Sequence, residues 1–127
     1  MKALWVCFAS SSHPLFLLVM GYKKVINKTN AALNVLLTVR KGDNPGTQVG
    51  TMAFLVAAGA TQTCTYSGNE NPYLDATFVS APIDGGLLST QQTVITRGGL
   101  VDNALNQNNT LTVTKTGEDL VAAFSNS

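Results

Sequence analysis

Apolar and polar residues alternate along most of the chain from Tyr22 onward. A period of two indicates β-strands with one buried face. In the segment 33–40, one predicted face consists of Leu33, Val35, Leu37 and Val39, and the other of Asn34, Leu36, Thr38 and Arg40. Further runs of strand length follow at 50–56, 61–66, 76–81, 89–97, 110–115 and 120–124.

Turn-forming residues separate these runs, at 42–46, 58–59, 69–72, 84–86 and 116–117. About eight short strands with this spacing are typical of an all-β antiparallel sandwich, Greek-key or jelly-roll-like. Because the pattern has no crossover helices, we expect no parallel sheet. One domain over residues 22–127 accounts for the whole pattern.

The stretch "GGLVDNALNQNN", residues 98–109, interrupts the alternation. Its apolar residues have helical spacing: Leu100, Val101, Ala104 and Leu105. We therefore expect one short helix over 100–105 that plugs an open end of the sandwich. A functional alternative is that Arg97, Asp102 and Asn103 line a polar pocket beneath this helix.

Charged residues are scarce, at 12% of the chain, and the net charge is +1. This is about half the usual share for a soluble protein. The few basic residues are dispersed, which argues against binding to nucleic acid. Low net charge also gives little repulsion between copies of the chain.

Residues 1–21 differ from the rest of the chain. Ser10–Pro14 interrupt their apolar residues, so they lack the roughly 20 continuous apolar residues of a membrane helix. Three interpretations stay open: a signal peptide, which implies secretion; an extension upstream of a start at Met20, which favours the cytoplasm; or a structural arm.

The sequence predicts no enzyme. His13 is the only histidine and lies in the atypical first segment, so a serine or cysteine nucleophile lacks its usual base. Glycine patterns for phosphate or dinucleotide binding are missing, and we expect no cofactor. No cysteine and histidine spacing suggests a metal site, and Cys64 fits a buried thiol within a strand.

The loop 66–75 is the best ligand candidate. Aromatic rings, amides and carboxylates together are typical of carbohydrate sites, with or without calcium. The residues concerned are Tyr66, Asn69, Glu70, Asn71, Tyr73 and Asp75. A lectin-like binding module is therefore the alternative function.

The first expectation for function is protein–protein contact, with self-assembly into a homo-oligomer. An open sandwich has strand edges, and charged residues normally protect such edges from neighbours. Lys23, Lys24 and Lys28 would guard an edge near the N-terminus. The C-terminal residues 120–127 carry no charge, so we expect edge pairing around Leu120–Phe124.

Overall fold

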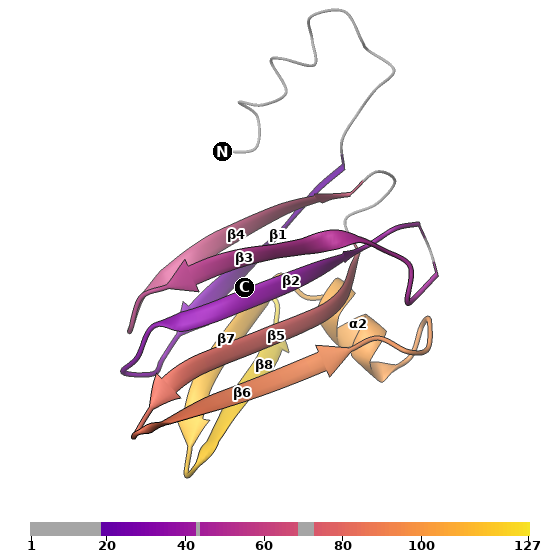
Figure 1. Ribbon diagram of the computed structural model, residues 1–127. Helices are drawn as coiled ribbons and strands as arrows, with labels where there is room; N and C mark the ends of the chain where they lie inside the picture. The colour runs from indigo at the N-terminus through magenta and orange to yellow at the C-terminus, as the bar shows by residue number, and fades with distance from the viewer. Residues whose placement is uncertain (1–18, 43, 69–72) are drawn as a thin grey trace, which may run out of the picture.

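The computed structural model describes residues 19–42, 44–68 and 73–127, and these form two four-stranded sheets (Figure 1). The elements are β1 (Val19–Asn27), β2 (Leu33–Arg40), β3 (Gln48–Val56), β4 (Thr61–Gly68), β5 (Leu74–Ile83), β6 (Gly86–Thr93), α2 (Leu100–Asn106), β7 (Thr110–Thr116) and β8 (Asp119–Ser125). One sheet has the order β4-β1-β7-β8 and the other β3-β2-β5-β6. The all-β sandwich expected from the alternation is confirmed.

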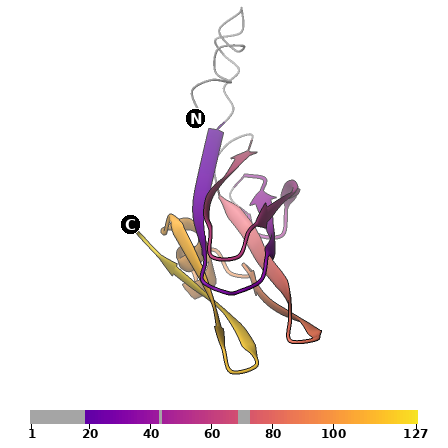
Figure 2. The same cartoon turned by 90° about the vertical axis from the view of Figure 1, so that its left-hand side faces the viewer.

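The two sheets form separate layers when the molecule is turned, with the β7–β8 hairpin in one and the β5–β6 hairpin in the other (Figure 2). The chain passes from one sheet to the other after β1, β3, β4 and β6. The first strand includes Met20 and Gly21, which pair with Ser67 and Tyr66 of β4. The folded unit therefore begins before Tyr22.

β1 is the exception to antiparallel pairing, and the expectation that its lysines guard an edge is wrong. β1 pairs antiparallel with β4 but parallel with β7. No crossover helix is needed, because the chain between β1 and β7 builds the other sheet and thereby makes the crossover itself. β1 is thus an interior strand, and Lys23, Lys24 and Lys28 do not guard an edge.

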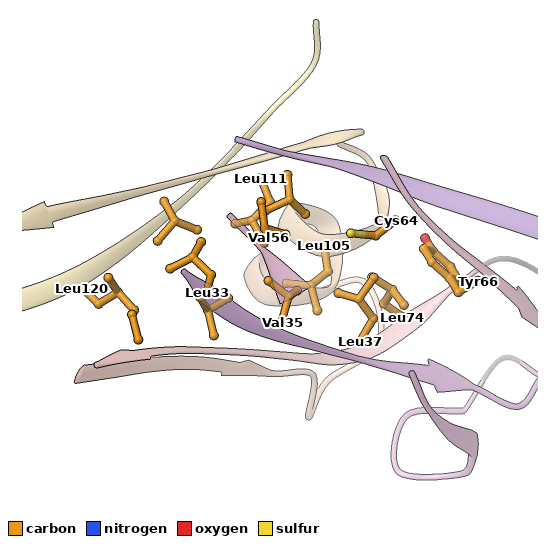
Figure 3. Close-up of a cluster of buried hydrophobic side chains, with 14 of the residues drawn as sticks. Leu33, Val35, Leu37, Val56, Cys64, Tyr66, Leu74, Leu105, Leu111 and Leu120 are labelled. Atoms are coloured by element: carbon orange, nitrogen blue, oxygen red, sulfur yellow. The ribbon is translucent and has the colours of Figure 1, made fainter. Parts of the chain in front are cut away.

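The core lies between the inward faces of the two sheets (Figure 3). The expected inner face of β2 is confirmed, because Leu33, Val35, Leu37 and Val39 are all buried. On β4 the threonines face outward, and Cys64 is buried as a free thiol, as expected.

Arg40 departs from the expected faces. Alternation placed it with the outward residues of β2, yet it is only 2% exposed. The pairing of β2 with β3 shifts register between Val39 and Arg40, which marks a bulge or irregularity. The extra residues lie in the neighbouring strands, Val49 of β3 and Asp75 of β5, so the regular pairing of β2 ends here. Arg40 is buried among its hydrogen-bond partners from β5 and α2.

The helix α2 forms where it was expected, at one end of the sandwich, and Leu105 points into the core (Figures 1 and 3). Leu100 is 87% exposed, so its expected place in the plug is wrong. The inward face is centred on Asp102 and Leu105, and Leu100 lies about 140° around the helix from Leu105.

Candidate functional site

A buried cation, Arg40, lies at the end of the sandwich that α2 covers. Its guanidinium donates hydrogen bonds to Asp102 Oδ1 at 2.8 Å, to the Leu74 carbonyl at 3.2 Å and to Asp75 Oδ1 at 3.3 Å. It also lies over the ring of Tyr73, 5.7 Å from the ring centroid. Every one of these partners belongs to an element other than β2, so Arg40 joins separate parts of the fold.

Asp75 connects β5 to the β2–β3 turn. Its side chain is 1% exposed, and its Oδ2 accepts hydrogen bonds from the Gly46 N–H at 2.8 Å and from Gln48 Nε2 at 3.0 Å. Gly46 adopts a φ of 92°, a conformation that glycine reaches without steric cost. The carboxylate thus fixes the turn and shares the charge of Arg40.

Asp102 connects the helix α2 to Arg40 in the same way. Burial raises the pKa of this carboxyl, but hydrogen bonds from the Gly98 N–H, Arg40 and Asn106, with the attraction of Arg40, outweigh burial and lower the pKa below its ordinary value. Asn106 in turn accepts from the Leu74 N–H at 2.6 Å and donates to the Leu74 carbonyl at 3.0 Å. The helix is therefore fastened to the first residue of β5.

These contacts describe a closed ionic network of Arg40, Asp75 and Asp102. Each charged group has several partners within it, as buried charges require. Chemically, such an arrangement holds loops and a helix in place. Asp102 is a poor general base, because its lowered pKa reduces its proton affinity.

An open cavity of about 220 Å³ adjoins this network. Arg97, Asp102 and Asn103, the three residues proposed from the sequence for a pocket near the helix, all line it. Asp102 directs its carboxylate to Arg40 and Gly98, while Arg97 and Asn103 are exposed. Ligand binding in this cavity stays a prediction.

A second cavity, of about 300 Å³, is lined by Lys23 of β1, Tyr66 of β4, Tyr73 and the residues that follow α2. Lys23 is 4% exposed, and burial lowers its pKa to about 8. Tyr66 is 2% exposed, and burial raises the pKa of its hydroxyl. Two polar groups of low solvent exposure thus share one cavity.

Hydrogen bonds with the C-terminal residues close part of the polar wall of the second cavity. Asn126 accepts a hydrogen bond from the Asn109 N–H at 2.9 Å and donates to the Gln107 carbonyl at 3.0 Å. Thr110 and Ser127 join their hydroxyls at 2.8 Å. These bonds hold the end of β8 against the segment between α2 and β7.

The predicted carbohydrate loop is only partly described. Asn69, Glu70 and Asn71 lie outside the described residues. Tyr66 and Tyr73 line the second cavity, whereas Asp75 is buried in the ionic network. The described members therefore do not present one shared surface, and carbohydrate binding stays a prediction.

Sequence reasoning missed Arg40, Gln48, Asn106 and Lys23 as members of this region. The signal for Lys23 was available, since alternation in "GYKKVIN" places it on the same face as Val25. Arg40 had no such signal, because its inward direction depends on the register shift.

No three potential metal-ligating side chains gather among the described residues. In the same part of the chain, no helix has the length and apolar character needed to cross a membrane.

No protein-family model matches the chain, and no curated protein matches it. Among solved structures, it is similar to the NMR structure of a protein from Eubacterium rectale, with a TM-score of 0.41 and 10% identity. The match covers 85% of this chain and 90% of that chain. A likeness this distant carries no functional assignment.

Proposed function

We propose that the protein acts without catalysis, through protein–protein contact, and that copies of the chain associate by pairing strand edges at β8. The observation that carries this proposal is the distribution of charge. Of the four edge strands, β3, β4 and β6 contain no charged residue, and β8 contains only Asp119, at its start. Exposed edges normally carry charges or proline that prevent such pairing.

β8 is the edge best prepared for a partner. Its outward side chains, Val121, Ala123 and Ser125, are small and neutral, and all three are exposed. Little desolvation accompanies their burial, compared with lysine or glutamate. The bonds of Asn126 and Ser127 hold the end of the strand in place, so less conformational entropy is lost on pairing.

The experiment places one lysine on the β8 edge strand, Ala123→Lys, and one on β7, Thr114→Lys. Thr114 belongs to the neighbouring interior strand and pairs with Val121. Sedimentation velocity over a wide concentration range measures association. We expect Ala123→Lys to weaken association about tenfold, which corresponds to about 1.4 kcal/mol, and Thr114→Lys to change it little.

Equal weakening by both variants would indicate packing through the sheet face and contradict edge pairing. A wild-type chain that stays monomeric at the highest concentration would contradict self-assembly altogether.

A further inference from the structure

The second cavity contains a buried cation that the described residues satisfy only in part. The Lys23 ammonium has three N–H donors, and it donates to one acceptor, the carbonyl oxygen of Asn108. Among the described residues it forms no ion pair. Buried ammonium groups are normally paired with an anion or fully hydrogen-bonded.

A second polar group in the cavity, the Tyr66 hydroxyl, also lacks hydrogen-bond partners among the described residues. Tyr66 is 2% exposed, and its hydroxyl forms no hydrogen bond to another residue in the described ranges. Buried tyrosine hydroxyls usually have a partner. Both orphan groups therefore require an acceptor or donor that this part of the protein does not supply.

The strand register brings the two groups together. Lys23 pairs with Cys64, and Tyr66 pairs with Gly21. Lys23 and Tyr66 are thus diagonal neighbours on the same inward face of β1 and β4, within reach of long side chains. Gly21 has no side chain to fill the space opposite the tyrosine ring, and it also lines the cavity.

The walls of the cavity select the charge of its occupant. Among the described lining residues there is no carboxylate, and Lys23 is the one cation. Burial lowers the Lys23 pKa to about 8, so the ammonium is still mainly protonated near neutral pH. Met20, Tyr22 and Tyr73 contribute apolar and aromatic surface, which favours an organic body over a bare ion.

We propose that this cavity binds a small organic carboxylate, whose oxygens accept hydrogen bonds from the Lys23 ammonium and the Tyr66 hydroxyl. The ring or carbon chain of the ligand lies against the tyrosine side chains at the mouth. The cavity adjoins the end of β8 through Asn126, but its two binding groups lie on β1 and β4, so binding is tested independently of self-assembly.

The probe is benzoate, added to the full chain, with glucuronate as a more polar carboxylate and inorganic phosphate as a bare anion. Binding is followed by NMR of the Lys23 side chain, because a bound carboxylate changes the pH at which the ammonium titrates. We expect saturable binding of benzoate, a rise of the Lys23 pKa in the complex, and weaker binding as the pH passes about 8.

Three variants separate binding from folding. Lys23→Met removes the cation with little change in volume, and we expect it to abolish binding while the thermal unfolding midpoint is unchanged or higher. Tyr66→Phe removes only the hydroxyl, and we expect about a tenfold loss of affinity, close to the lower end of the range for a hydrogen bond to a charged group. Lys24→Met, on the next residue of β1, is the matched control and should bind like the wild type.

Three results would overturn the proposal. Benzoate and glucuronate both fail to saturate, which indicates a cavity that holds only water. Phosphate binds as tightly as benzoate, which indicates a site that does not distinguish between anions. Lys23→Met binds benzoate like the wild type, which places the probe elsewhere.

Discussion

Replacement of Arg40 by methionine tests the ionic network at its centre. Arg40 is 2% exposed and donates to two carboxylates, Asp75 and Asp102, with side-chain exposures of 1% and 11%. In the variant both carboxylates stay in place without their cation. Removal of one partner from a buried ion pair destabilises a protein by about 3–5 kcal/mol.

The contacts give a similar magnitude. Three hydrogen bonds of the guanidinium are lost, including those to the carboxylates of Asp102 at 2.8 Å and Asp75 at 3.3 Å. A hydrogen bond to a charged group is worth about 1.5–3 kcal/mol. The remaining donors soften the loss, because Asp75 keeps Gly46 and Gln48 and Asp102 keeps its helix partners. We expect Arg40→Met to lower the free energy of unfolding by about 4 kcal/mol.

The dependence on pH gives a sharper test than the magnitude alone. In the wild type the folded pKa of Asp102 is lowered, so its contribution is present above the unfolded pKa and is lost as the pH falls through the folded value. In the variant, the hydrogen bond and the attraction of Arg40 no longer oppose the effect of burial, so the Asp102 pKa is higher than in the wild type. The deficit of Arg40→Met should therefore shrink as the pH falls from about 7 to about 4.5, where a raised carboxyl is protonated.

Urea unfolding of both proteins at the two pH values measures this difference. The control is Lys115→Met, which breaks the exposed pair with Asp84, 3.4 Å apart with side chains 32% and 75% exposed. Such surface pairs are worth less than about 1 kcal/mol. If Arg40→Met costs no more than this control, or if its deficit grows in acid, the network does not stabilise the fold in the way described.

Two further predictions concern the core. Leu105→Ala should destabilise the protein by about 2–5 kcal/mol, because its side chain is fully buried. Leu100→Ala, on the exposed side of the same helix, should change stability by less than about 0.5 kcal/mol. Equal losses of stability in chemical denaturation would show that Leu100 packs against the core. The Cys64 thiol is buried and its pKa is raised to about 11, so it should react with iodoacetamide only when the chain unfolds; rapid labelling of the native protein, measured by mass spectrometry, would contradict this burial.

The sandwich was predictable because several strands alternate between buried and exposed residues, although β3 is mostly exposed and β5 is mostly buried. The alternation in β2 and β4 depends only on neighbouring residues, and the structure confirms it for Leu33 and Cys64. The turns at Asp84 and Gly117 were also predictable from neighbouring residues, because both residues adopt positive φ angles there.

The candidate site was less predictable, because it depends on contacts between distant segments. Arg40 and Asp102 are separated by 62 positions, and nothing in either segment identifies the other. Lys23 faced inward according to its strand pattern, but a charged residue is expected at the surface unless a partner is known. The partners of β1 also have no local signature, so its position in the middle of a sheet could not be read from the sequence.

The parallel pairing of β1 with β7 has a consequence for the order in which the chain is completed. Lys23 and its acceptor Asn108 are 85 positions apart, so this side of β1 finds its neighbour only after most of the domain has been synthesised. During synthesis on the ribosome, β1 emerges before the other described strands, but its edge toward β7 stays unpaired until β7 has emerged. A chain interrupted before Thr110 would expose that edge permanently, and we expect such fragments to aggregate rather than fold.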